Sequence, residues 1–271
     1  MRWFGLQRLG SLVLCALLIA PLPAAATEVE VDVQLFLAVD VSRSMSPREL
    51  EIQRRGYAEA LVSEPVVKAI RSGLLGRVAL TYVEWAGPFS QRVIVPWTMV
   101  ENQRDAQAFA AKISTNFNPA MRRTSISGAV QYATGSFTGN GFISNRRVID
   151  VSGDGPNNQG RPVLVARDEA IEAGFIINGL PLMTREGLGA SFGIDNLDAY
   201  YRDCVIGGPG AFVIPVYTWD QFPAAVRRKL VLELAGRAPA LPLHRASAKP
   251  KADCLVGEKM WQMFRDRSFM P

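Results

Sequence analysis

Oxygen-bearing side chains stand at every second position where the first long strand-like run of the chain ends. Residues 31–40 read VDVQLFLAVD and the chain continues VSRS, so Asp40, Ser42 and Ser44 occur at positions i, i+2 and i+4. A carboxylate and two hydroxyls are hard ligands of the kind that Mg²⁺ and Mn²⁺ prefer. Because the chain turns directly after a buried strand, these side chains are free to converge on one cation. The stretch therefore predicts part of a metal site.

Two later residues can complete such a site: Thr124, before a predicted helix, and Asp154, after the strand-like segment RRVIDVSG. Taken alone, D-x-S-x-S is a weak signal, because its serines could instead satisfy backbone groups in an ordinary turn. The order of all five residues and their places at strand ends favour the metal. Asp150, within the same segment, is not assigned a role; a buried acid paired with an arginine is one interpretation.

The donor types also indicate which cation is expected. Zinc prefers imidazole and thiolate ligands, whereas the single histidine of the chain, His244, lies in a predicted linker. Hydroxyl and carboxylate oxygens point to magnesium or manganese, ahead of calcium. The predicted ligands are Asp40, Ser42, Ser44, Thr124 and Asp154.

The elements that must position these residues alternate between strand and helix. Strands are predicted within residues 31–40, 76–87, 91–100, 146–155, 176–183 and 211–218, and helices within 46–62, 101–113, 124–137, 162–175, 195–205 and 219–236. This alternation predicts an α/β fold with a doubly wound, mainly parallel sheet and helices on both faces. The carboxyl ends of parallel strands share one edge of the sheet, which is where ligands bind in such folds.

The five residues resemble the metal-ion-dependent adhesion site of von Willebrand factor type A domains, in which D-x-S-x-S is followed by a distant Thr and then by D-G after a later strand. The resemblance covers about residues 31–236 and implies a Rossmann-like topology. The segments VSGDGPNN, YYRDCVIGGPGAFV and DCLVGEKMW resemble most the exported bacterial family catalogued as domain of unknown function 1194. One departure is Gly153, where many type A domains carry Thr.

The resemblance implies binding, not turnover. In type A domains an Asp or Glu carboxylate of a partner protein occupies the open position on the metal. Two carboxylates and three neutral hydroxyls only just cancel the charge of a dication, so an anion is still attracted, and helix N-termini at the same edge favour it too. A structural or scaffold module, in which the metal merely ties loops together, is the alternative.

An enzyme is not expected, although a hydrolase using Ser42 or Ser44 is a second alternative. Such a serine needs a base, and His244 lies in the predicted linker. A phosphatase with an aspartyl nucleophile would want a second acid two residues after Asp40, where Ser42 stands. The glycine-rich phosphate-binding patterns of nucleotide enzymes are absent from the sequence.

Residues 1–26 are predicted to be a signal peptide. Arg2 and Arg8 flank an apolar run that ends in small residues, and cleavage is expected after Ala26. A transmembrane anchor is disfavoured because prolines interrupt the end of this run, and lipidation of Cys15 is disfavoured because Leu14 precedes it. The mature protein is expected to be periplasmic or secreted, with no stable membrane span after cleavage.

Charge and cysteine content bound the remaining possibilities. Without Arg2 and Arg8, 28 of the 30 basic residues remain against 25 acidic residues, a net charge of +3. Arginine pairs at 54, 122, 146 and 227 are scattered and are interpreted as solvated faces, so no nucleic-acid partner is expected. Cys204 and Cys254 are expected to form a disulfide, with two unrelated buried thiols as the alternative.

The expected domain boundaries follow from the same patterns. Residues 27–236 form the von Willebrand A-like domain. Residues 237–271 are a linker, rich in Pro, Ala and Lys over 237–253, and a C-terminal tail that docks back on the domain through Cys254.

Overall fold

The computed structural model describes residues 27–115, 120–184, 193–235, 244–245 and 251–268. The predicted signal peptide lies outside these residues. Seven strands form one sheet in the order β4-β3-β2-β6-β7-β8-β9, in which all neighbours are parallel except β4 beside β3 and β9 beside β8. The predicted doubly wound, mainly parallel sheet is confirmed. The strands are β2 (Gln34–Asp40), β3 (Val78–Trp85), β4 (Gln91–Val100), β6 (Arg147–Gly153), β7 (Phe175–Pro181), β8 (Phe212–Val213) and β9 (His244–Arg245).

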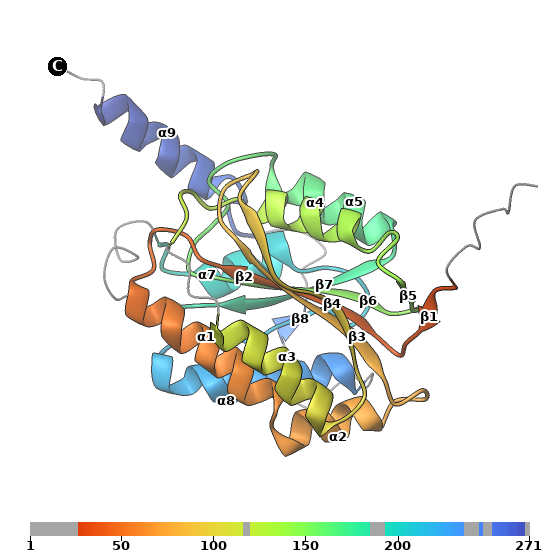
Figure 1. The fold of residues 1–271 in the computed structure, drawn as a ribbon. Coiled ribbons are helices and arrows are strands. Elements are labelled where there is room, and N and C mark those ends of the chain that lie inside the picture. Colours follow the sequence, from red (N-terminus) through yellow and green to blue (C-terminus); the bar gives the residue numbers. More distant parts are fainter. Residues whose placement is uncertain (1–26, 116–119, 185–192, 236–243, 246–250, 269–271) are drawn as a thin grey trace, which may run out of the picture.

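Helices cover both faces of the sheet (Figure 1). One face carries α1 (Pro47–Leu61), α2 (Glu64–Arg71), α3 (Gln103–Thr115) and α8 (Phe222–Leu234), and the other carries α4 (Ile126–Ser136), α5 (Val163–Glu172) and α7 (Leu197–Tyr200). A π-helical turn, η1 (Tyr201–Val205), continues α7, and a 3₁₀ turn, η2 (Trp219–Gln221), precedes α8. A final helix, α9 (Val256–Ser268), leaves the body of the domain. A small separate sheet pairs β1 (Val29–Glu30) with β5 (Phe142–Ile143).

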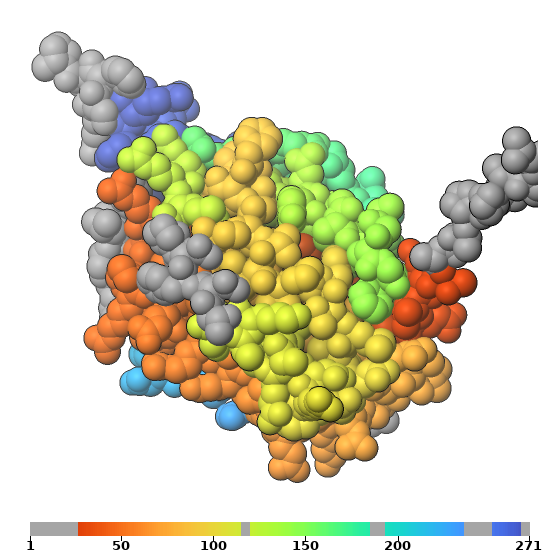
Figure 2. All heavy atoms as spheres, in the orientation of Figure 1, coloured from red at the N-terminus to blue at the C-terminus, as the bar shows by residue number. Residues whose placement is uncertain are grey.

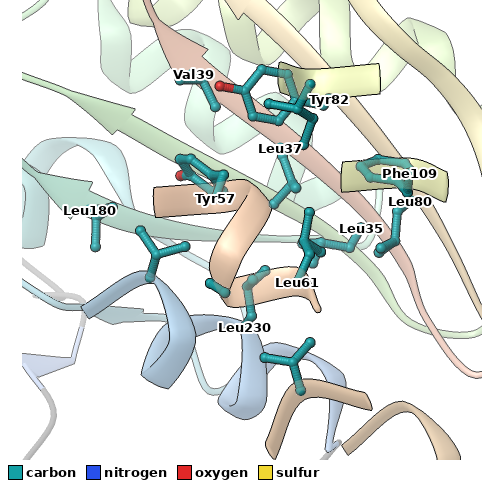
Figure 3. Packing of buried hydrophobic residues seen from close by; sticks show 14 of the residues in the cluster. Leu35, Leu37, Val39, Tyr57, Leu61, Leu80, Tyr82, Phe109, Leu180 and Leu230 are labelled. Atoms are coloured by element: carbon teal, nitrogen blue, oxygen red, sulfur yellow. The ribbon is translucent and has the colours of Figure 1, made fainter. Parts of the chain in front are cut away.

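The central strand β2 explains why the sheet is covered on both sides. All seven of its residues are buried, as expected of a parallel strand between two helical layers. Leu35, Leu37 and Val39 point to the α1 and α8 side, where Tyr57 and Leu230 pack against them (Figure 3). The intervening Phe36 and Ala38 join the core below α4 and α5. This alternation has the period of two that a strand imposes.

Two helix starts fix the loops that follow the sheet edge. Ser46 caps α1 by accepting a hydrogen bond from the Glu49 amide, and the Glu49 carboxylate accepts one from the Ser46 amide, so the two residues form a capping box. Ser125 caps α4 in the same way by accepting from the Gly128 amide. Ser42, Ser44 and Thr124 therefore lie in the loops before these helices.

Several elements differ from the expectation. The strand predicted over 211–218 is regular only at Phe212–Val213, and Pro215, which lacks an amide hydrogen, cannot extend the ladder. The helix predicted over 195–205 is replaced by α7 and the π-helical turn, which together span residues 197–205. The predicted linker supplies β9, which pairs with β8. Within the described residues, no helix combines the length and the apolar character that a membrane crossing needs.

The interpretation of the arginine pairs as solvated faces is wrong for Arg54. This side chain is buried and donates to Glu84, with the Arg54 Nε to Glu84 Oε1 distance 2.7 Å. Asp150 is a buried acid, but its ion-pair partner is a lysine: the Lys229 Nζ lies 2.6 Å from Asp150 Oδ1. Buried charges of this kind persist only when they are paired. The interface of α1 and α8 with the sheet therefore contains ion pairs among its apolar contacts.

Candidate metal centre

Adjacent parallel strands bring the two predicted carboxylates to the same edge of the sheet. Strands β2 and β6 pair in register up to Val39 and Ser152. Asp40 is the last residue of β2 and Asp154 is the first residue after β6, so both lie at neighbouring strand ends. The loop before α4 joins them because the Met121 amide donates to the Val41 carbonyl at 2.8 Å. Three loops that are distant in sequence thus meet at one place.

A chain of hydrogen bonds links the first two loops. The Ser42 amide donates to Asp40 Oδ1 at 2.6 Å, the hydroxyls of Ser42 and Ser44 lie 2.9 Å apart, and Ser44 donates to Asp154 Oδ1 at 2.8 Å. Four of the five predicted ligands are therefore connected directly.

Thr124 is held by the loop that follows Asp154. Its amide donates to Asn158 Oδ1 at 3.1 Å and its carbonyl accepts from the Asn158 amide at 2.9 Å. Ser44, Thr124 and Asp154 line one small cavity of about 10 Å³, which is about the space that one water molecule needs. Asp40 and Ser42 lie behind it and are almost fully buried.

The charges around this cavity fit a cation. Asp40 Oδ2 is buried without a hydrogen-bond partner. Burial, and then the nearby Asp154, raises the pKa of Asp40 well above its usual range. Burial also raises the pKa of Asp154 to about 6, against a lowering by the Ser44 hydrogen bond. Two desolvated carboxylates beside each other lack a compensating positive charge, which a divalent cation would supply.

The donor set relies on hydroxyls as well as carboxylates. Across the described part of the chain, no group of three or more His, Cys, Asp or Glu side chains gathers as a metal cluster. Two carboxylates and three hydroxyls are instead an all-oxygen set, which suits Mg²⁺ or Mn²⁺. The only histidine, His244, belongs to β9, three places from β6 in the sheet order.

Gly153 has a steric reason for lacking a side chain. A Cβ atom at this position would lie 2.8 Å from Asp40 Oδ2 and 2.9 Å from the Tyr201 hydroxyl. The Tyr201 hydroxyl is buried and, like Asp40 Oδ2, has no hydrogen-bond partner. The departure noted at Gly153 therefore makes room for two polar groups at the back of the site.

Sequence reasoning missed three residues around the site: Tyr201, Asn157 and Asn158. The segment DGPNN carried a signal for the asparagines, since side-chain amides commonly hold loops by bonding backbone groups. Tyr201 carried none, because in sequence it is one more apolar position of a predicted helix.

Comparisons with known proteins agree with this architecture. A family model described as "Protein of unknown function (DUF1194)" matches residues 30–238. No curated protein sequence matches. Among solved structures, proximal thread matrix protein 1 from the mussel byssus superposes with a TM-score of 0.56 at 13% identity, over 78% of this chain and 50% of that one.

A second structure of the mussel protein, described as having a zinc-occupied MIDAS motif, gives a TM-score of 0.56 at 14% identity over 78% and 50% of the two chains. The pilus adhesin SpaC from Lactobacillus rhamnosus GG gives 0.54 at 12% identity over 77% and 32%. The chain thus spans half or less of the length of these proteins. At such identities the likeness concerns the fold alone.

Proposed function

Because the chain belongs to the family of proteins of unknown function DUF1194 and has a von Willebrand A-like fold, we propose that it is an exported, metal-dependent protein-binding module. In this proposal Mg²⁺ or Mn²⁺ is held by five residues and recruits an acidic side chain of a partner protein. One observation carries the proposal: three loops converge on a cavity the size of one water molecule, beside a buried carboxylate oxygen without a partner. The ligands are Asp40, Ser42, Ser44, Thr124 and Asp154.

The residues of the chain account for the chemistry of recognition. When bound, the cation supplies positive charge and an open coordination position for an anion. Asp40 and Asp154 only balance its charge, and the hydroxyls of Ser42, Ser44 and Thr124 are neutral. The N-termini of α1 and α4 follow the loops of this site, and their dipoles also favour an anionic group. A carboxylate of a partner protein satisfies both conditions.

The fold supports the proposal without identifying the partner. The mussel protein of similar fold is described with zinc in a MIDAS motif, which indicates that a domain of this shape can hold a divalent cation at such a motif. We expect magnesium or manganese in this chain because its donors are all oxygens. The protein acts by binding in the periplasm or outside the cell and performs no turnover.

A selection from displayed random peptides tests the proposal. The protein should retain peptides in Mg²⁺ and release them in EDTA, and the retained peptides should share an Asp or Glu whose change to Asn or Gln abolishes binding. Thr124→Ala should lower the affinity of such a peptide at least tenfold. Thr134→Ala is the matched control, since its hydroxyl donates to the local Gln131 carbonyl within α4.

Three results would contradict the proposal. Retention that is equal in Mg²⁺ and EDTA would exclude recruitment through the metal. A metal that raises the stability of the fold while no carboxylate peptide binds would favour the structural alternative. Ester hydrolysis abolished by Ser42→Ala would favour the hydrolase.

A further inference from the structure

The C-terminal tail is fixed to the domain beside the candidate metal centre. Cys254 forms a disulfide with Cys204 of the π-helical turn, with their Cα atoms 5.5 Å apart. Just before it, the amides of Lys251 and Ala252 donate to the buried Asp203 Oδ2 at 2.9 and 3.0 Å. These contacts set the point from which α9 starts.

The first turn of α9 contacts the loop that carries Asp154. Asn157, which is fully buried, donates from its side-chain nitrogen to Glu258 Oε1 at 2.7 Å. A Cβ atom at Gly257 would lie 2.1 Å from the Asn157 carbonyl oxygen, so only glycine lets the two backbones approach this closely. Asn157 Oδ1 in turn accepts from the Ser127 amide at 3.0 Å, which ties the loop to α4.

The second turn of α9 contacts the residue before Thr124. The Arg123 guanidinium carbon lies 3.6 Å from the centre of the Trp261 ring, a cation–π contact. Arg123 has a φ of +77°, the only positive value among the non-glycine residues described, and a backbone of this kind costs free energy unless its surroundings hold it. Figure 2 shows α9, in blue, beside the yellow-green segment that precedes α4.

One helix thus holds two of the three loops that carry the predicted ligands, and Thr124 and Asp154 of these loops line the same cavity. We propose that α9 is a brace that positions Thr124 and Asp154 for the cation, with Trp261 and Glu258 as positioning residues. Trp261 acts through Arg123, and Glu258 acts through Asn157. The inference rests on the proposed metal site but goes beyond it, because α9 lies outside the residues that the family model matches.

Four variants of the full-length mature protein test the brace. Trp261→Ala and Glu258→Ala each remove one contact, while Glu258→Gln keeps an oxygen that can accept from Asn157. Met263→Ala is the control on the same helix, because this side chain is 55% exposed. Two measurements are made on each: Mn²⁺ affinity by calorimetry, and hydrogen exchange of single amides in EDTA.

Trp261→Ala and Glu258→Ala should each weaken Mn²⁺ binding about tenfold, the lower end of what loss of an outer-shell contact costs. In EDTA, the Thr124 amide should exchange faster in Trp261→Ala, and the Ser127 amide should exchange faster in Glu258→Ala. Glu258→Gln and Met263→Ala should match the unmodified protein in both measurements.

Unchanged Mn²⁺ affinity in both alanine variants would overturn the brace, even if their thermal stability fell, because a merely structural helix predicts that pattern. If the unmodified protein itself binds no Mn²⁺, the proposed function fails, and amide exchange alone decides the brace. Unchanged exchange at Thr124 and Ser127 would then contradict it.

Discussion

Two buried oxygens at the back of the candidate site, Asp40 Oδ2 and the Tyr201 hydroxyl, lie within 3 Å of the same point beside Gly153 and lack hydrogen-bond partners. Burial, and then the charge of Asp40, raises the pKa of Tyr201 well above its usual range. The hydroxyl therefore stays protonated and can donate. In a metal-loaded site a donor beside Asp40 fixes the direction in which the carboxylate points.

Tyr201→Phe should consequently weaken Mn²⁺ binding about tenfold, which is within the range of outer-shell substitutions, without unfolding the domain. Tyr82→Phe is the matched control, because its hydroxyl is also buried and unpartnered but belongs to the cluster on the other face of the sheet. Calorimetry with Mn²⁺ measures both. Equal losses in the two variants would show that the effect is not local to the site.

The residues of the site differ in how far sequence could predict them. Asp40, Ser42 and Ser44 stand at every second position, so their spacing alone suggests that they share one cation. Asp154 could be placed because it follows a recognisable strand. Tyr201 could not, because its place beside Asp40 depends on a π-helical turn. The spacing of apolar residues does not predict whether a helix has α-helical or π-helical hydrogen bonds.

At the scale of elements, α8 packs a charged cluster against the sheet. Lys229 and Glu233 of this helix face Asp150 of β6. Burial, and then the charge of Asp150, raises the pKa of Tyr57 of α1 well above its usual range. The charge of Glu233 also acts on Arg146, and the side-chain amide of Asn178 donates a hydrogen bond to Glu233. Burial raises the pKa of Asp150 to about 7, although the neighbouring Lys229 opposes this shift.

This cluster predicts a pH dependence of stability. The folded protein keeps a proton on Asp150 that the unfolded chain loses near pH 4, so the contribution of this group to stability is complete below pH 4 and is lost as pH rises towards about 7. Asp150→Asn removes that dependence. Urea unfolding at pH 4.5, 6 and 8 should show a free energy of unfolding that falls more with pH in the unmodified protein than in Asp150→Asn. Parallel curves would contradict the assignment.

The elements themselves were predictable where a long apolar run or a helical spacing of apolar residues was present, as in β2 and α1. The sequence pattern was less informative at β8, because β8 pairs with β7 through a single pair of residues. The pattern could not predict β9 or the pairing of β1 with β5, because two-residue strands have no periodicity and are fixed by the strands that they pair with.

At the scale of the whole molecule, the disulfide joins the tail to the domain across 50 residues. A chain-entropy treatment gives about 4 kcal/mol for closing a loop of this length in the unfolded state. The Cys204→Ser, Cys254→Ser double variant should therefore unfold at a clearly lower urea concentration. Urea unfolding followed by tryptophan fluorescence measures the loss, and an unchanged midpoint would show that the tail is held without the disulfide.

The fold class was visible from sequence because strand and helix alternate along the chain, and crossovers between parallel strands are almost always right-handed. The position of α9 was not, since it depends on a disulfide and on side-chain contacts between segments more than 100 residues apart, such as Asn157 with Glu258. Sequence could state that Cys254 pins a tail, but not that the tail reaches Arg123.

The central claim is that the sheet edge holds one divalent cation, and titration of the mature protein with Mn²⁺ by calorimetry tests it most directly. Asp40 supplies the buried oxygen without a partner, so Asp40→Asn keeps the size of the side chain while removing the charge that balances the cation. The account predicts one Mn²⁺ per unmodified chain and binding at least 100-fold weaker in Asp40→Asn, since a carboxylate that would bind the cation is lost. Equal Mn²⁺ binding by the two proteins, or none by either, would contradict it.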